Sequence, residues 1–287
     1  MQTHDLNIVV DTSVSTFLNE CGPLLYQNEA MNSLMLGLLE GLKTQSPAVQ
    51  PLLVRILENG KIVSVAVSFR KQPMNIILTY ASDTHLRFLA EHLQKTGEVF
   101  TGVVGPKIES EKFAQIWKEC SGKNFELAMD QKIYQIDRVE FPQDIIGEMR
   151  VAEIQDTDLV FEWIKAFTQE SLPGDKRTDQ QWKEFAVNVT RKQGVYLWVQ
   201  NEKPVSMAVA SRSTRNGVSI TGVYTPPVNR KKGYASAVVA SLSQKMLDQG
   251  KRFCVLYTDL ANPTSNKIYQ KIGYREVAAS MHFNFIE

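Results

Sequence analysis

Two segments of the chain are alike when the sequence is shifted by 142 positions. Between residues 59–70 and 201–212, seven of the twelve positions are identical, where about one is expected from average residue usage. Each segment starts at an asparagine in a polar turn and continues into an alternating strand, which is typical of a β-hairpin. A hairpin repeated at the same place predicts a duplicated domain. The length of 287 residues is enough for two hydrophobic cores.

The predicted helices and strands follow one order twice. In the first half, apolar spacing predicts helices at 29–42, 84–95 and 109–120 and strands at 52–57, 62–69, 75–80, 99–104 and 125–136. In the second half it predicts helices at 154–167, 180–192, 233–249 and 263–272 and strands at 195–200, 205–211, 217–224, 253–258 and 276–285. Pro142 interrupts the pattern, so we expect a linker between a domain at 1–140 and a domain at 145–287.

Composition argues against several classes of protein. The formal net charge of +1 creates no overall field that would attract nucleic acid or an anionic membrane. Three cysteines without short spacing favour neither a zinc site nor a disulfide framework, so we expect no metal. The first residues do not resemble a signal peptide, and no stretch has the roughly 18 to 20 apolar residues that cross a bilayer. We therefore expect a cytoplasmic protein with no nucleic-acid or membrane partner.

The most informative segment runs from Tyr224 to Ala235. An apolar strand ends there, two prolines prevent further strand pairing, a basic loop follows, and a helix begins at Gly233. The first N–H groups of a helix lack partners and carry the positive end of its dipole, so they bind anions. Gly233 lets a ligand approach the backbone closely. The segment therefore predicts a binding site for a pyrophosphate.

The same segment resembles a known family. Arg230-Lys231-Lys232-Gly233-Tyr234-Ala235 is similar to the Q/R-x-x-G-x-G/A signature of the GCN5-related N-acetyltransferase superfamily, between a strand and a helix as in that family. Downstream, residues 258–274 resemble its second hallmark, N-x6-Y-x3-G-F/Y, with Asn262, Tyr269 and Gly273 at the named positions. The hallmarks cover about residues 217–275, and the order of elements extends the resemblance back to about residue 150.

The resemblance implies an α/β fold and a cofactor. Each domain would be a mixed, mostly antiparallel sheet flanked by helices. In the second domain, the parallel strands 217–224 and 253–258 would splay apart and hold the pantetheine arm of acetyl-CoA, the acyl donor. The backbone at Val223 and Thr225, with Asn262 and Asn266, would contact the pantetheine end, and the Arg230 side chain and the backbone from Lys231 to Ser236 would hold the pyrophosphate. The cofactor-binding residues implied are Val223, Tyr224, Thr225, Arg230, Lys231, Lys232, Gly233, Tyr234, Ala235, Ser236, Asn262 and Asn266.

Tyr269 resembles the family's usual general acid. When an amine attacks a thioester, a thiolate leaves, and a phenol within hydrogen-bond distance can protonate its sulfur. Packing beside Gly273 is the alternative for Tyr269. Glu162 and Glu170 are candidate bases because the first helix of the domain and the loop after it usually line the acceptor site, although each could equally be a solvated carboxylate. Cys254 lies among apolar residues, which favours direct transfer over an acetyl-cysteine intermediate.

The first half lacks these features. Its third strand leads into Ala81-Ser82-Asp83 without an Arg/Gln-x-x-Gly, and 112–122 contains no tyrosine. We therefore interpret 1–140 as a degenerate copy that does not bind CoA and helps to shape the acceptor site.

The function predicted for the chain is N-acetyltransfer to a primary amine of a small molecule or peptide. One alternative is a non-catalytic acyl-CoA-binding protein, which the retained Tyr269 and the complete basic loop disfavour. Another is an aminoacyl transferase that uses charged tRNA, which the balanced charge disfavours. The acceptor, the acyl length and the oligomeric state stay open.

Overall fold

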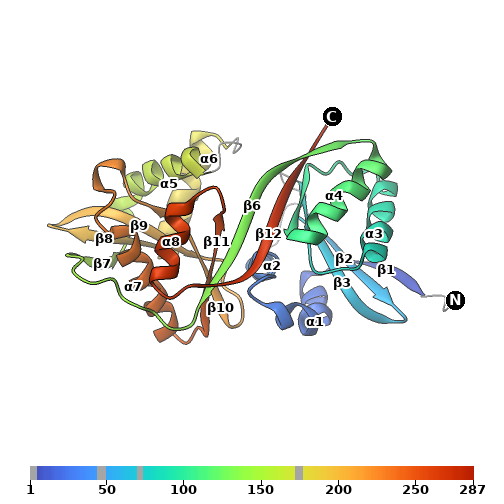
Figure 1. Cartoon of the computed structure of the whole chain (residues 1–287), viewed down its shortest axis with the longest axis horizontal. Helices are drawn as coiled ribbons and strands as arrows, with labels where there is room; N and C mark the ends of the chain where they lie inside the picture. Colours follow the sequence, from blue (N-terminus) through green and yellow to red (C-terminus); the bar gives the residue numbers. More distant parts are fainter. Residues whose placement is uncertain (1–4, 44–49, 70–73, 172–176) are drawn as a thin grey trace. The chain divides into compact units, whose positions relative to one another are not determined.

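The computed structural model describes residues 5–43, 50–69, 74–171 and 177–287. The chain forms two compact units, and each is described by itself (Figure 1). The first unit contains the chain through Ile133, together with Thr258–Ala261 and Glu276–Glu287. The second contains Tyr134–Tyr257 and Asn262–Arg275.

Within the described residues, each half of the chain contributes the same succession of strands and helices, short 3-10 turns aside. The first half contains β1 (Leu6–Asp11), α1 (Val14–Leu25), α2 (Ser33–Leu42), β2 (Leu52–Glu58), β3 (Lys61–Ser68), β4 (Asn75–Leu78), α3 (Asp83–Lys95), β5 (Gly102–Pro106), α4 (Lys107–Ser121) and β6 (Asn124–Ile136). The second half contains β7 (Glu148–Val151), α5 (Thr157–Ser171), α6 (Asp179–Arg191), β8 (Val195–Gln200), β9 (Lys203–Ser211), β10 (Gly217–Tyr224), α7 (Tyr234–Asp248), β11 (Phe253–Asp259), α8 (Pro263–Lys271) and β12 (Arg275–Ile286). The predicted α/β fold class is confirmed.

The repeated hairpin carries the same irregularity in both copies. In β2–β3 the register shifts so that Val63 is the extra residue, and in β8–β9 it shifts so that Val205 is the extra residue. These two valines correspond under the 142-residue shift. A β-bulge depends on local backbone geometry as well as on composition, so its repetition supports a duplicated domain over two hairpins that converged on similar residues.

The turns of the two hairpins also match. Asn59 and Gly60 have φ angles of 51° and 76°, and Asn201 and Glu202 have φ angles of 47° and 63°. Two successive residues with positive φ form the tight turn whose twist suits a hairpin. Asparagine tolerates this conformation better than most residues do, which explains why it recurs at the first position of both turns.

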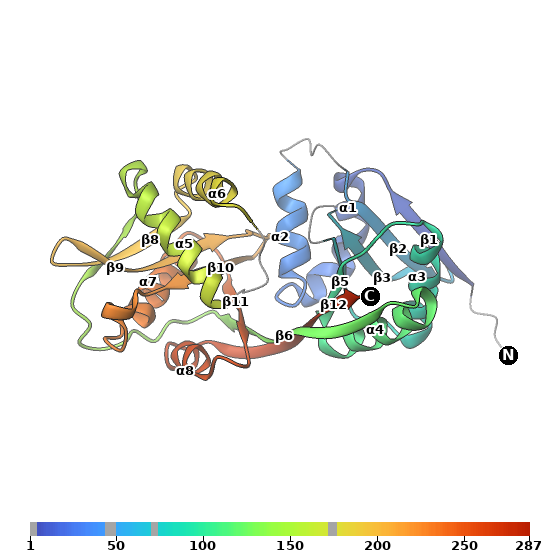
Figure 2. The same cartoon turned by 90° about the horizontal axis from the view of Figure 1, so that it is seen from above.

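The sheet of the first unit runs in the order β1-β2-β3-β4-β5-β12. All neighbours are antiparallel except β4 and β5, which are parallel. Two buried clusters lie on its opposite faces: α3 and α4 pack on one, and α1 and α2 pack on the other (Figure 2). This unit is therefore a three-layer domain with its core on both sides of the sheet.

The sheet of the second unit runs in the order β11-β10-β9-β8-β7. Here β10 and β11 are parallel and the other pairs are antiparallel. Helices α5 and α6 cover one face, and α7 covers the other. The mostly antiparallel order with one parallel pair is the arrangement that the resemblance implied.

The last strand of the chain does not stay with the second unit. β12 pairs antiparallel with β5, from Ser280 opposite Pro106 to Asn284 opposite Gly102, and Met281 and Phe283 pack into the first unit's core. Conversely, Tyr134 at the end of β6 is buried in the second unit's core. The sequence analysis assigned all of 145–287 to the second domain, and the structure differs at this strand.

Three further elements differ from the sequence-based expectations. β1, α1 and β7 were not predicted, and α1 contains Gly22 and Pro23, which are unusual inside a helix. The predicted helix at 29–42 begins only at Ser33. Ser82 caps α3 by accepting a hydrogen bond from the His85 N–H at 3.3 Å, so this helix begins at Asp83, one residue before the predicted start. None of the described helices combines the length and apolar character needed to cross a membrane.

Candidate active site

The two parallel strands of the second unit separate along their length. β10 and β11 are paired only from Gly217 to Ser219 and from Phe253 to Val255, although the strands continue to Tyr224 and Asp259. Beyond Ser219, the backbone groups of β10 that face β11 therefore have no strand partner in the described part of the chain. An extended ligand with amide groups could bind there as an added strand does.

A bulge in β10 lies beside this separation. The pairing with β9 shifts between Thr221, opposite Val209, and Tyr224, opposite Met207. Gly222 has a φ of 56°, and a Cβ built there would lie 3.0 Å from the Val209 side chain. The bulge turns Tyr224 toward α5, where its ring centroid lies 6.2 Å from that of Trp163.

The loop that follows β10 ends in a run of unpaired backbone donors. The first bond of α7 joins the Ala237 N–H to the Gly233 carbonyl at 3.0 Å. Within the described residues, the six N–H groups from Lys231 to Ser236 make no hydrogen bond. Lys231 and Gly233 have φ angles of 62° and 82°, and such left-handed residues next to a helix start gather N–H groups into a concave anion site.

Gly233 is required at its position for two reasons. Its φ of 82° lies in the left-handed region, and a Cβ built there would clash with the Ile145 side chain. Any other residue would be strained and would displace Ile145, which packs against the second unit's core. The expectation that a ligand approaches the backbone at Gly233 closely stays a prediction.

Arg230 is held by a carboxylate. Its Nη2 donates to both oxygens of Glu170 at 2.8 Å, and its Nε donates to the Thr225 carbonyl at 2.9 Å. The hydrogen bond to Glu170 raises the pKa of the guanidinium. Both side chains are exposed, at 42% and 47%, so the pair can open to let Arg230 meet another anion. Glu170, a candidate base, is engaged by Arg230, whereas Glu162 lies exposed on α5.

Two of the carbonyls proposed to hold pantetheine already have protein donors. Ser206 Oγ donates to the Tyr224 carbonyl at 3.0 Å, and Arg230 Nε donates to the Thr225 carbonyl at 2.9 Å. Val223 lies in the bulge between the paired residues Thr221 and Tyr224. The Val223 backbone is therefore the clearest acceptor or donor for a pantetheine amide on this strand.

The second hallmark forms α8 and its cap. Asn262 Oδ1 accepts from the Ser265 N–H at 3.1 Å, and Asn266 Nδ2 donates to the Asn262 carbonyl at 2.9 Å. The carboxamide oxygen of Asn262 thus caps a helix, a role for which asparagine is favoured. The proposed contacts of Asn262 and Asn266 with pantetheine stay predictions.

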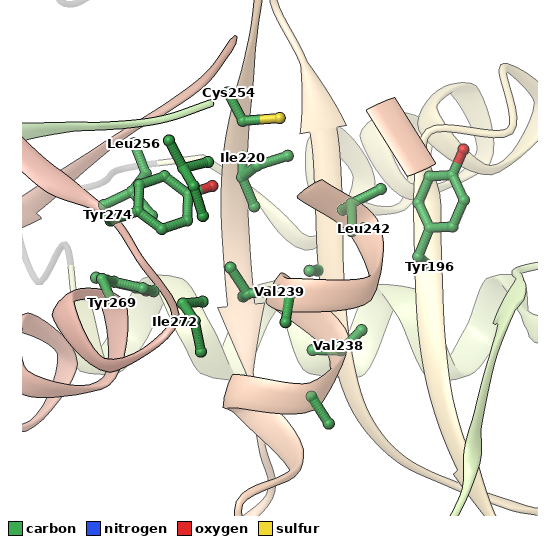
Figure 3. Packing of buried hydrophobic residues seen from close by; sticks show 14 of the residues in the cluster. Tyr196, Ile220, Val238, Val239, Leu242, Cys254, Leu256, Tyr269, Ile272 and Tyr274 are labelled. Atoms are coloured by element: carbon green, nitrogen blue, oxygen red, sulfur yellow. The ribbon is translucent and has the colours of Figure 1, made fainter. Parts of the chain in front are cut away.

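Tyr269 is buried, with 9% of its surface exposed. It lies with Tyr274 and Ile272 in the cluster that Figure 3 shows, and its ring centroid is 6.0 Å from that of Tyr274. Burial raises the Tyr269 pKa to about 12, against the effect of a hydrogen bond with Ser265. The phenol therefore keeps its proton at neutral pH, as a general acid must, while its ring fills the core. The structure shows the packing role that the sequence left open for Tyr269, and the role of general acid stays a prediction.

The Tyr269 pKa predicts the shape of a pH profile. Because its folded-state pKa lies near 12, the protonated fraction stays constant below about pH 11. If Tyr269 is the acid, the rate of acetyl transfer should rise as the amine deprotonates and should not fall between about pH 8 and pH 10. Initial rates of thiol release, with circular dichroism to verify folding, test this. A falling limb in that range would assign the acid to a group with a lower pKa.

The other residues singled out in the sequence differ in how far they are buried. The Tyr234 side chain is buried, and its hydroxyl donates to Gln200, so only its backbone faces the anion site. Lys231 and Lys232 are exposed. Cys254 is buried as predicted, and burial raises its pKa to about 12. Such a thiol is a poor nucleophile.

No cluster of His, Cys, Asp or Glu suited to a metal occurs among the described residues.

The corresponding place in the first unit is different. β4 ends at Leu78, and a Cβ built on Gly105 of β5 would lie 2.9 Å from Leu78 atoms, so the two strands stay in close contact. The start of α3 is capped by Ser82, and Asp83 pairs with Lys112. An acidic side chain at a helix start repels phosphate, which agrees with the interpretation that this half does not bind CoA.

Comparisons with known proteins agree with this fold. A family model described as FR47-like protein matches residues 199–283. No curated protein matches the sequence. A solved Drosophila protein is similar over 99% of both chains, with a TM-score of 0.68 and 10% identity. A GCN5-related N-acetyltransferase from Sphaerobacter thermophilus covers 96% of this chain and 95% of its own, with a TM-score of 0.60 and 13% identity.

A tandem protein of the same superfamily, from the clavulanic acid biosynthesis pathway, is similar over 98% of both chains, with a TM-score of 0.58 and 9% identity. The similarity extends over both halves of the chain, as a duplicated domain requires. The chain therefore has the fold of the GCN5-related N-acetyltransferases, and residues 199–283 match the FR47-like family model.

Proposed function

We propose that the second unit binds acetyl-CoA and transfers its acetyl group to a primary amine of a small molecule or peptide. The observation that carries this proposal is the run of unpaired N–H groups from Lys231 to Ser236, directly after the strand that separates from β11. A pyrophosphate fits such donors, and an amide-containing arm fits the unpaired strand edge. Acetyl-CoA carries both groups in one molecule.

The proposed transfer takes place in a ternary complex. A neutral amine attacks the thioester carbon, the C–N bond forms, and the C–S bond breaks. Tyr269 donates its proton to the departing sulfur, the ammonium proton leaves to water, and the phenolate takes a proton back from water. Because an α-amine has a pKa of about 7.7 to 8.0, part of it is neutral near pH 7. The transfer therefore needs no strong base, and we assign that role to no residue.

Calorimetric titration of the whole chain with acetyl-CoA tests the first step. We expect one site of micromolar affinity, because an acidic residue, Asp83, stands in the first turn of α3, the corresponding helix of the first unit. An amine panel monitored by thiol release then tests transfer. No acetyl-CoA binding would exclude the enzyme, and binding without thiol release from any amine would support a non-catalytic acyl-CoA-binding protein.

The Glu170–Arg230 pair yields a separate prediction. The Glu170 carboxylate competes with pyrophosphate for Arg230, so Glu170→Gln should tighten acetyl-CoA binding. An exposed pair contributes about 0.2 to 1 kcal/mol, which limits the gain to about fivefold. Calorimetry measures this change, and kcat should stay the same.

Glu162→Gln is the matched variant, because it removes a carboxylate from the same helix without touching Arg230. It should leave acetyl-CoA affinity unchanged. A loss of kcat of tenfold or more in either variant would instead identify that residue as the base.

A further inference from the structure

Arg212 has an unusual environment for a cation. It directly follows β9, and its Nε is buried without a hydrogen-bond partner among the described residues. It forms no ion pair in that part of the chain. A buried donor without a partner destabilises the folded state, above all when it is charged. Its presence therefore needs an explanation other than stability.

The other partly buried arginines of the chain show what is missing. Arg55 donates through Nε and Nη2 to both oxygens of Asp11, at 2.8 and 2.9 Å. Arg150 donates to both oxygens of Asp156, at 2.6 and 2.8 Å. Two guanidinium groups are therefore satisfied by a forked carboxylate, the partner that suits their planar geometry. Arg212 lacks this partner.

The backbone at Arg212 is also strained. Its φ is 42°, in the left-handed region that favours glycine. Strain of this kind persists when a residue is needed for something other than stability. Burial lowers the pKa of Arg212, and the electrostatic interaction with Tyr257 raises it. No carboxylate contributes among the described residues.

Arg212 directly follows the end of β9, which pairs with β10 where β10 begins to separate from β11. The preceding Ser211 lies opposite Ser219, and Thr221 lies opposite Val209. Val209 packs under α5 and α6. Because opposite partners share a face and side chains alternate, Ser211, Ser219 and Thr221 line the same face.

That polar stretch of β10 is also where the strands separate. Ser219 is the last residue of β10 paired with β11, and it lies opposite Val255. Its Oγ is buried without a hydrogen-bond partner in the described structure. Tyr257, two residues beyond Val255, faces the same side as Ser219. The Ser219 hydroxyl is thus a buried donor without a partner among the described residues, beside the gap in the sheet and on the face that also carries Tyr257.

The charge around this loop is positive. Residues 211–221 contain two arginines and no acidic residue. Lys251 Nζ donates to the Thr214 carbonyl at 2.7 Å, and the Arg252 N–H donates to the Asn216 carbonyl at 2.8 Å. The surroundings therefore favour an anion beside Arg212.

We propose that Arg212, assisted by Ser219, binds the carboxylate of the acetyl acceptor, so that the acceptor is an amine that also carries a carboxylate, such as a free amino acid. This proposal rests on the proposed function. A carboxylate gives Arg212 the forked acceptor that Arg55 and Arg150 obtain from aspartates. The amine of the same molecule is then directed to the thioester at the separation of β10 and β11.

The test uses amino acids and their matched amides, for example alanine and alaninamide, as acceptors for the whole protein. Arg212→Gln should lower kcat/KM for the acid by about 10- to 100-fold, the range for a lost charge-assisted hydrogen bond. It should leave kcat/KM for the amide and acetyl-CoA affinity unchanged. Comparing the acid-to-amide ratio between proteins cancels the different reactivity of the two amines.

Arg215→Gln is the control, since it makes the same change at an exposed position on the same loop. Its acid-to-amide ratio should match that of the wild type. Thermal unfolding adds a readout independent of turnover. With no native partner to lose, Arg212→Gln should melt at or above the wild-type temperature. CoA alone should raise the melting temperature of both proteins, and alanine added to the CoA-bound protein should raise it further in the wild type only.

Each contrary outcome has a separate meaning. If Arg212→Gln lowers the rates with acid and amide equally, or melts lower, Arg212 is structural and the inference is wrong. If the wild type acetylates amides but no carboxylate-bearing amine, the inference is wrong while the proposed function stands. If the wild type does not bind acetyl-CoA, the proposed function itself fails.

Discussion

Gly233→Asp should weaken acetyl-CoA binding by at least about 100-fold. The new carboxylate would lie within the N–H groups from Lys231 to Ser236, where the pyrophosphate is proposed to bind. Two like charges about 4 Å apart repel by about 4 kcal/mol near a protein surface, which corresponds to several hundredfold in affinity. The Cβ would also clash with Ile145 and move the loop. Calorimetric titration with acetyl-CoA measures the loss.

Gly250→Asp is a closely matched control. Gly250 also has a positive φ, 92°, and lies just beyond the other end of α7, but a Cβ there meets nothing within 4 Å. Both variants should lose about 1 to 2 kcal/mol of stability from the left-handed backbone. Only Gly233→Asp should lose the cofactor. Retained micromolar affinity in that variant would place the pyrophosphate elsewhere.

Tyr269→Phe should lower kcat by about 100- to 10,000-fold, the range attributed to a positioned general acid. Acetyl-CoA affinity should hardly change, because the ring still fills the same space. The variant loses only a hydroxyl whose partner is Ser265, so the fold should persist. Single-turnover thiol release separates this effect from binding or product release.

Tyr274→Phe makes the same change five residues away. The Tyr274 hydroxyl is 2.9 Å from Ser243 Oγ inside the same core, and its loss should cost about 1 to 3 kcal/mol of stability. It should leave kcat unchanged. If both variants lose kcat to the same extent, Tyr269 acts through packing, and another group protonates the thiolate.

The sequence determined the parts of this protein that depend on neighbouring residues. The prolines after β10 and the glycine before α7 each act over a few positions, so the loop and the start of α7 could be predicted from them. The hairpin repeat identified a duplication for the same reason, because turn and bulge are local features. An element was missed where the local signal was weak, as in α1 with its internal Gly22 and Pro23.

Tertiary structure alone decided which distant groups meet. The alternation in β12 predicts a strand but does not specify its neighbour, and the strand pairs with β5 in the first unit rather than staying with the second. Glu170 and Arg230 lie sixty positions apart, so no spacing rule predicts that the carboxylate engages the arginine. In the sequence, Arg212 was only one of the seven identical positions between residues 59–70 and 201–212. The missing partner of its Nε became visible only in the folded chain, because the cost of burying a charged donor depends on everything that surrounds it.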